Sequence, residues 1–236
     1  MIGTEEQKRM EERVQTVRRQ MEEAARQAGR RMEEIRLLAA SKTQSAQTVA
    51  FSAGLAIDCF GENRAQELVE KMDAGAYGDK PVHMIGHLQK NKAKYVVGRA
   101  ALIHSADSLE LAREICRQAQ KKGLTQDVLI EVNLAGEQSK SGVAPRELDS
   151  LLEEICRLEG LRVRGLMAIP PVSRQPGQNR PYFSALRQLF VDIKSKRYDN
   201  VSMDCLSMGM SQDFCDAIAE GATLVRIGSG IYGPRS

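Results

Sequence analysis

The sequence lacks tryptophan, and its 236 residues include only three histidines and five cysteines. The cysteines are Cys59, Cys116, Cys156, Cys205 and Cys215. Their number is odd, no two form a Cys-x-x-Cys pair, and none has a histidine at ligand spacing, which argues against both a disulfide framework and a zinc site. We therefore expect buried thiols in a reducing compartment and no metal centre.

Long hydrophobic runs are also missing. No stretch approaches the roughly 20 apolar residues that a membrane span needs, and residues 1–12 lack the apolar core of a signal peptide. The 34 basic and 31 acidic residues give a net charge of only +3 and are interspersed. A protein with this pattern is not expected to bind nucleic acid or a membrane, and we predict a cytoplasmic location.

The hydrophobic content of 42% is ordinary for a soluble protein, while aromatic residues reach only 4%. The core must therefore consist mainly of Leu, Ile, Val, Ala and Met side chains. A chain of this length suits one large domain, and we expect residues 1–236 to form it.

The first segment, residues 4–28, predicts a helix that packs on this domain by one stripe. Apolar residues spaced by three or four form the stripe: Met10, Val14, Val17, Met21 and Ala25. Thr4 is a candidate N-cap and Gly29 a candidate C-terminal stop. The charged remainder predicts a solvated face.

After this helix, short apolar runs alternate with helical segments. The predicted strands are residues 35–41, 56–60, 83–86, 101–104, 128–133, 161–168, 201–206 and 223–228. The predicted helices are residues 46–53, 62–73, 89–97, 108–122, 145–158, 181–197 and 211–219, with a final turn at 230–233. Eight such units indicate a closed (β/α)₈ barrel with an extra N-terminal helix. An open doubly wound sheet is the alternative.

In such a barrel the chemistry lies at the C-terminal ends of the strands, and Lys42 follows the first strand directly. Two loops dense in Gly, Pro, Ser and charge, residues 137–144 and 170–180, follow later strands at this same end. Lys42 therefore carries more functional weight than the other basic residues.

Two segments after the last two strands predict an anion site. Residues 207–211 place Ser207 and Ser211 at the expected start of a helix, where free N–H groups favour an anion. Gly228, Ser229 and Gly230 form a second bend, and phosphate binding by these two loops recurs in barrels. Each segment alone could be an ordinary turn.

Arg226 lies inside the last strand, where an unpaired cation would be costly, so it needs a partner. A structural salt bridge and a cofactor contact are both open. A lysine facing a phosphate site across a barrel favours pyridoxal 5′-phosphate (PLP) as cofactor, because PLP is held by a lysine Schiff base and by its phosphate.

Several motifs occur in an order that is characteristic of one family. They are ASK (40–42), FGEN (60–63), QE (66–67), HMIGHLQKNK (83–92), VN (132–133), EQSKSG (137–142), GLMAIP (165–170), LSMGMS (206–211) and VRIGSGIYG (225–233). Together they closely resemble the YggS/PROSC family of pyridoxal phosphate homeostasis proteins. Gln44, Ser45 and Arg64 depart from common family residues without touching the expected anchors.

The resemblance implies an alanine-racemase-like (fold-type III) barrel with Lys42 as the covalent Schiff-base lysine. It implies that Ser211, Gly228 and Ser229 hold the phosphate, with Ser207 nearby, and that Arg226 faces the pyridine nitrogen. It also implies a pocket lined by Asn63, His87, Asn133 and Met167.

The implied function is binding, buffering and delivery of PLP to PLP-dependent apo-enzymes, with an influence on amino-acid and keto-acid balance and without catalytic turnover. A guanidinium cannot accept a proton, so an arginine that faces the pyridine nitrogen of PLP leaves this nitrogen unprotonated. The PLP ring is then a weaker electron sink. The chain also ends soon after Tyr232, and the second domain that carries a racemase base is not expected. A small racemase is the second hypothesis, and a barrel enzyme for another phosphorylated substrate the third.

Simpler roles compete with some of these assignments. Asn63 could cap the next helix as readily as contact a cofactor, and His83 and His104 are expected to be hydrogen-bonded core or rim residues.

A basic patch is formed by Lys90, Lys92 and Lys94. Such a patch is usually a solvated helix face, and we hypothesise a second ligand site or a contact with a client enzyme there. We expect a monomer, with a dimer as the alternative.

Overall fold

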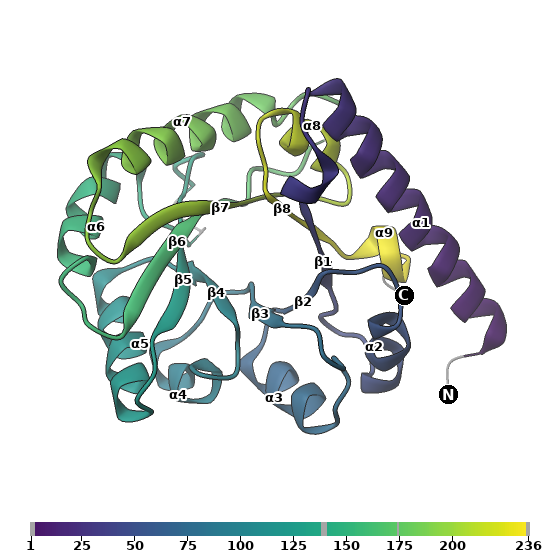
Figure 1. The fold of residues 1–236 in the computed structure, drawn as a ribbon, viewed down its shortest axis with the longest axis horizontal. Coiled ribbons are helices and arrows are strands. Elements are labelled where there is room, and N and C mark those ends of the chain that lie inside the picture. Colours follow the sequence, from purple (N-terminus) through teal and green to yellow (C-terminus); the bar gives the residue numbers. More distant parts are fainter. Residues whose placement is uncertain (1–2, 138–140, 174, 235–236) are drawn as a thin grey trace.

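Eight parallel strands form a closed barrel in the computed structural model, which describes residues 3–137, 141–173 and 175–234 (Figure 1). The strands are β1 Arg36–Ala40, β2 Cys59–Glu62, β3 Val82–Met84, β4 Leu102–Ala106, β5 Gln126–Glu131, β6 Leu161–Met167, β7 Val201–Met210 and β8 Leu224–Ile227. Each strand pairs with the next, and β1 closes the ring by pairing with β8, with Leu38 beside Arg226. The predicted closed barrel is confirmed, and the open sheet is excluded.

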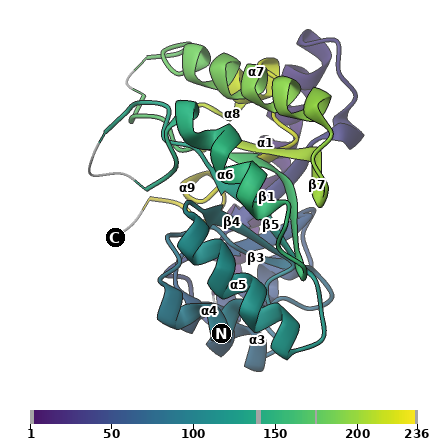
Figure 2. The same cartoon turned by 90° about the vertical axis from the view of Figure 1, so that its left-hand side faces the viewer.

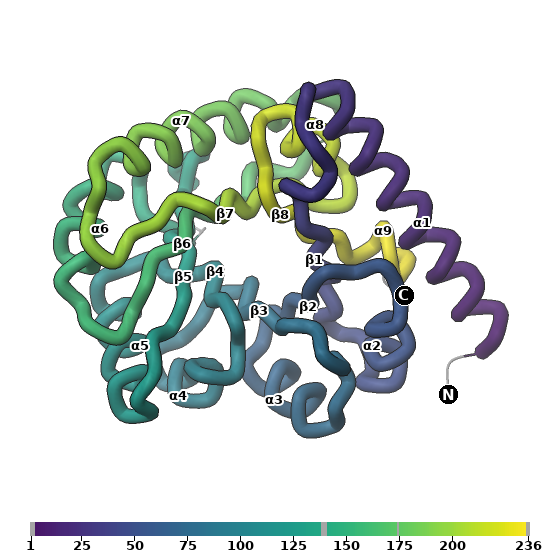
Figure 3. Tube along the Cα trace, in the orientation of Figure 1, coloured from purple at the N-terminus to yellow at the C-terminus, as the bar shows by residue number. Residues whose placement is uncertain are grey.

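Helices surround this ring, as the tube in Figure 3 shows. They are α1 Thr4–Gln27, α2 Ala46–Ala53, α3 Ala65–Asp73, α4 Ala93–Val96, α5 Leu109–Lys121, α6 Leu148–Ile155, α7 Arg180–Lys196, α8 Phe214–Ala219 and α9 Ser229–Tyr232. Short 3₁₀ turns η1 Met32–Glu34, η2 Lys90–Lys92 and η3 Pro145–Glu147 precede β1, α4 and α6. In Figure 2 the loops that follow β5 and β6 extend from the same end of the barrel as α9.

The N-cap of α1 lies one residue earlier than predicted: it is Gly3, and Thr4 is already helical. No side chain of the described residues caps this end. Gly29 follows the helix with φ of 65°, as a C-terminal stop requires. The predicted apolar stripe is buried against α8 and α9, and Figure 1 shows α1 running along both.

Strand β7 is longer than its sequence predicted. It continues to Met210, and α8 begins only at Phe214, so Ser207 lies inside a strand rather than at the start of a helix. Gly209 explains the difference: with φ of 88° it sits where the register to β8 shifts, and a Cβ there would lie 2.5 Å from the Cβ of Ala217. The strand therefore continues past its predicted end through a bulge at a position that only glycine can occupy. Similarly, β2 continues to Glu62, and α3 starts at Ala65.

The core has two layers. A larger cluster fills the space between strands and helices, and a smaller one, including Leu38, Leu129 and Met167, fills the barrel interior. Cys59, Cys116 and Cys205 are buried as expected. The prediction of buried thiols is wrong for Cys156, which is half-buried, and for Cys215, which is exposed on α8. Within the described ranges, no helix is long and apolar enough to cross a membrane.

Candidate active-site cavity

A cavity of about 240 Å³ opens at the C-terminal end of the barrel strands. Six of the predicted site residues line it: Lys42, Asn63, Ser211, Arg226, Gly228 and Ser229. They come from the ends of β1, β2, β7 and β8, which lie far apart in the sequence. The closed ring brings them together, because neighbouring parallel strands end at one rim.

Lys42 is half-buried and follows β1 after the fully buried Ser41. The next residue, Thr43, has φ of 67°, a left-handed conformation that is a real outlier for a β-branched side chain. Its N–H donates to Glu67 Oε2 at 2.9 Å. The backbone next to Lys42 is therefore held by a side chain of α3 that does not line the cavity.

Backbone N–H groups from β8 and α9 converge on one point of the cavity wall. Gly228 N and Gly230 N each donate to Ser211 Oγ at 3.2 Å. The Ser211 loop is itself fixed by Asp213, whose Oδ1 accepts from Met210 N at 2.7 Å. Because two donors and a hydroxyl meet here, this corner can bind an anion such as a phosphate.

Arg226 is 4% exposed and faces the cavity. Its Nη1 donates to Ser207 Oγ at 2.5 Å and its Nη2 to the Ala168 carbonyl at 3.0 Å. Burial lowers the pKa of Arg226 to about 10. Among the described residues no carboxylate lies within ion-pair distance of this guanidinium, so the structural salt bridge is not what holds it.

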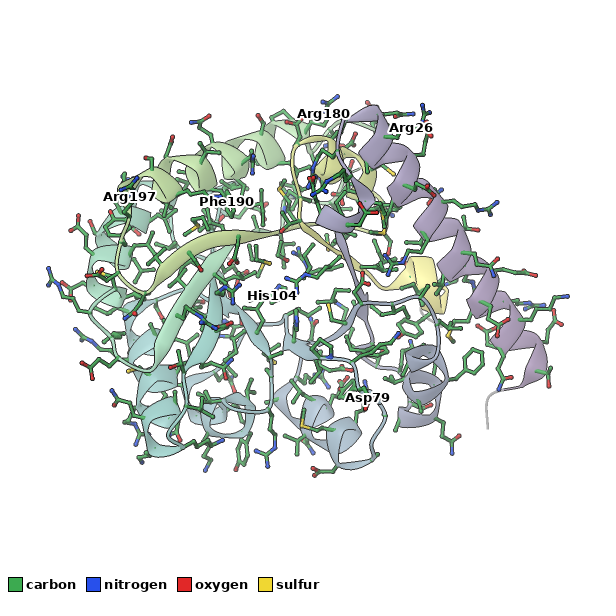
Figure 4. The ribbon with its side chains drawn as sticks, viewed as in Figure 1. Arg26, Asp79, His104, Arg180, Phe190 and Arg197 are labelled. Atoms are coloured by element: carbon green, nitrogen blue, oxygen red, sulfur yellow. The ribbon has the colours of Figure 1, made fainter. Side chains whose placement is uncertain are left out.

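The arginine begins a buried polar chain that crosses the barrel interior. Ser207 Oγ lies 3.0 Å from His104 Nδ1, and His104 Nε2 lies 3.0 Å from His83 Nδ1. Burial lowers the pKa of His83 to about 3 and that of His104 far below its ordinary value, so both rings are neutral at physiological pH. Figure 4 shows His104 within the ring of strands. Both histidines are hydrogen-bonded core residues, as expected, but the sequence did not predict their link to Arg226.

Four predicted site residues do not line the cavity. Ser207 lies beneath it in this chain, and Met167 is fully buried in the apolar cluster inside the barrel. His87 is exposed, with Nδ1 3.2 Å from Ser141 Oγ, and Asn133 Nδ2 donates to the Glu137 carbonyl at 2.9 Å. The capping alternative for Asn63 is wrong, because the N-cap of α3 is Arg64. Asn63 lies on the cavity wall instead.

The two predicted loops are described only in part, because residues 138–140 and Arg174 lie outside the described residues. Pro171, Val172 and Ser173 of the second loop line the cavity. Lys90, Lys92 and Lys94 lie elsewhere: Lys90 pairs with Glu110, and the other two ammonium groups lie 5.8 and 4.9 Å from the centre of the Tyr95 ring.

Residues 13–236 match the family model "Alanine racemase, N-terminal domain". A pyridoxal phosphate homeostasis protein of Aquifex aeolicus is 46% identical over 200 residues, which cover 85% of this chain and 87% of that protein. The chain belongs to the pyridoxal phosphate homeostasis protein family. The resemblance predicted from the sequence motifs is therefore confirmed.

Solved structures agree with this assignment. An unknown protein from Bifidobacterium adolescentis has a TM-score of 0.91 and 34% identity, covering 98% of this chain and 97% of that one. The family member PipY of Synechococcus elongatus, solved with PLP bound, has a TM-score of 0.76 and 32% identity, covering 85% and 93%. Alanine racemase of Clostridium difficile, at 15% identity, shares only the fold, with a TM-score of 0.67 and 59% of that chain covered.

Proposed function

We propose that this protein binds PLP and acts in PLP homeostasis, holding the cofactor and delivering it to other enzymes. One observation carries the proposal: a single cavity is lined by a lysine, an anion-binding corner and a buried arginine. Its relatives in the family support the same function, since PipY has been solved with PLP bound.

The residues on the cavity wall fit the cofactor's chemical groups. Gly228, Ser229 and Ser211 would hold its phosphate, because the N–H groups of this corner already converge on one hydroxyl oxygen. Lys42 would bind its aldehyde, and Arg226 would face its ring nitrogen. Asn63 would form part of the wall, while Ser207 would act through Arg226. His87, Asn133 and Met167 remain predicted contacts.

PLP supplies an aldehyde that reacts reversibly with an amine, and a ring that can act as an electron sink. In this chain the residue facing the ring nitrogen would be Arg226, which donates hydrogen bonds but has no proton acceptor. The ring nitrogen would therefore stay unprotonated, which weakens the electron sink. This chemistry suits reversible storage better than turnover of an amino acid.

The absorbance spectrum of the purified protein with added PLP tests the proposal. We expect a visible absorption band that disappears on borohydride reduction, with the reduced adduct mapped to Lys42. The Lys42→Ala variant should lose the band, whereas Lys90→Ala should keep it, because Lys90 lies away from the cavity on η2. A wild-type protein that forms no adduct at Lys42 would contradict the proposal.

Two further assays separate delivery from catalysis. An apo-enzyme that requires PLP should be reactivated by the loaded protein faster than free release of the cofactor allows. Deuterium exchange at the α-carbon of amino acids should be absent, and rapid, saturable exchange would favour the racemase hypothesis instead.

We further propose a cytoplasmic monomer whose partners are PLP-dependent apo-enzymes. The free state of all five cysteines supports a reducing compartment.

A further inference from the structure

Both residues that flank Lys42 are held by the same group of charged side chains. Ser41 Oγ donates to Glu62 Oε1 at 2.6 Å, and the Ser41 carbonyl accepts from Lys71 Nζ at 2.8 Å. On the other side, Thr43 N–H donates to Glu67 Oε2 at 2.9 Å. The backbone on either side of Lys42 is thus fixed by Glu62 of β2 and by Lys71 and Glu67 of α3.

These three side chains are also joined to one another. Lys71 Nζ lies 2.8 Å from Glu62 Oε1 and 3.6 Å from Glu67 Oε2, so one ammonium bridges both carboxylates. The Glu62 side chain is fully buried and that of Lys71 is 7% exposed. Tyr77 adds a third donor to Glu62 Oε1 at 3.2 Å. All three donors converge on Oε1, while Glu62 Oε2 is buried without a hydrogen-bond partner among the described residues. The donors therefore fix the orientation of this carboxylate through one oxygen.

The network lies directly beside a strained residue. Thr43 adopts φ of 67°, which a β-branched residue keeps only where its surroundings impose it. The hydrogen bond from Thr43 N–H to Glu67 Oε2 holds this part of the backbone in place. If Thr43 relaxed, the chain direction at Lys42 would change, since the two residues share a peptide bond.

We propose that Glu62, Lys71 and Glu67 form a backbone clamp that aims Lys42 at the cavity. They are positioning residues for covalent attachment of the cofactor, and none of the three lines the cavity itself. This inference rests on the proposed function, because it concerns how the same lysine reaches its ligand. The strained conformation of Thr43 then serves to orient Lys42.

The clamp can be tested with two ligands that differ in one group. PLP can bond covalently to Lys42, whereas pyridoxine 5′-phosphate has no aldehyde and reports only on the rest of the cavity. For each variant we would measure the rate and equilibrium of covalent attachment by visible absorbance and the affinity for pyridoxine 5′-phosphate by calorimetry. The full-length chain is used throughout.

We expect Glu67→Ala to weaken covalent attachment roughly tenfold, the scale of the strain at one left-handed residue, with unchanged affinity for pyridoxine 5′-phosphate. Glu67→Gln keeps an acceptor oxygen for Thr43 N–H and should behave almost as wild type. Glu70→Ala is the matched control, since Glu70 is exposed on the same helix and its side chain bonds only that of Gln66 among the described residues. Adding Thr43→Gly to Glu67→Ala should restore attachment in part, because glycine adopts positive φ without strain.

The outcomes distinguish failure of the proposed function from failure of the clamp. If wild type forms no adduct at Lys42, the proposed function fails and the clamp with it. If wild type reacts and Glu67→Ala reacts equally well, the clamp alone is overturned. An equal loss of both ligands in Glu67→Ala would also overturn it, because that result indicates general damage to the cavity.

Discussion

At the scale of single residues, a buried carboxyl group lies close enough to Arg226 for their charges to interact. Glu131, at the end of β5, is 7% exposed, and burial raises its pKa to about 7 from an ordinary value of 4.5, with Asp107 adding to the shift and Arg226 opposing it. The carboxyl group therefore changes charge within the physiological range. A group that is buried and titrates there makes stability depend on pH.

Between pH 4.5 and 7 the folded protein holds a proton on Glu131 that the unfolded chain has released. Stability from this group is therefore complete below the unfolded pKa and lost as pH rises through the folded one. We expect Glu131→Gln to be nearly neutral at low pH and to stabilise the protein by on the order of 2–3 kcal/mol at pH above 8. Urea unfolding at several pH values measures this difference.

The exposed Glu153 on α6 provides the control, and Glu153→Gln should leave the pH dependence of unfolding unchanged. Parallel stability curves for wild type and Glu131→Gln across this range would show that the Glu131 carboxyl is ionised and well accommodated in the folded protein.

At the scale of elements, α1 lies behind the anion-binding corner. It packs on α8 and on α9, and α9 begins with Ser229. Val17 of α1 reaches the same place, since its Cγ2 would lie 3.6 Å from a Cβ at Gly230. The N-terminal helix therefore supports the loop that carries two cavity residues, in addition to covering the barrel.

Met21 is completely buried in this packing. Met21→Ala should lower the free energy of unfolding by about 2–5 kcal/mol, because it removes apolar contacts and leaves a cavity between α1 and the barrel. Gln20→Ala, one residue earlier on the exposed face, should change it by less than about 0.5 kcal/mol. Denaturant unfolding compares the two, and equal effects would show that α1 is not packed as described.

At the scale of the whole molecule, the cavity joins segments from both ends of the chain. Lys42 follows the first strand, whereas Ser211, Arg226 and Gly228 belong to the last quarter, and β1 pairs directly with β8. A ligand that contacts all of them binds only the closed barrel. Binding should therefore stabilise the fold as a unit.

At a PLP concentration about a hundredfold above Kd, the stabilisation should be about 2.7 kcal/mol, or roughly 5–10 °C in Tm for a domain of this size. Thermal unfolding with increasing PLP measures this stabilisation. The part that comes from the covalent bond should be absent in Lys42→Ala. Light scattering on the same samples measures the molecular mass and so tests the proposed monomer. A Tm that does not respond to PLP in wild type would contradict binding to the folded barrel.

The sequence by itself determined the barrel and the main members of the site. Strand and helix patterns alternate along the chain, because local periodicity and turn chemistry are encoded in neighbouring residues. Lys42 and the glycines near residue 228 follow strands, and Arg226 lies in the last one. The expected anion site added Ser211, and the family resemblance added a pocket role for Asn63; both residues line the cavity. All of these are visible without coordinates.

Only the tertiary structure decided what lies beneath those residues. One example is the hydrogen-bonded chain from Arg226 through Ser207 and His104 to His83. Another is the pair of hydrogen bonds that hold Ser41, from its hydroxyl to Glu62 and to its carbonyl from Lys71. Both join residues from different strands and helices that no local pattern relates. The bulge at Gly209, which moves Ser207 into β7, depends on the close approach of α8. Closing the ring creates these contacts, because it brings side chains from distant parts of the sequence into one interior where each buried polar group must find a partner.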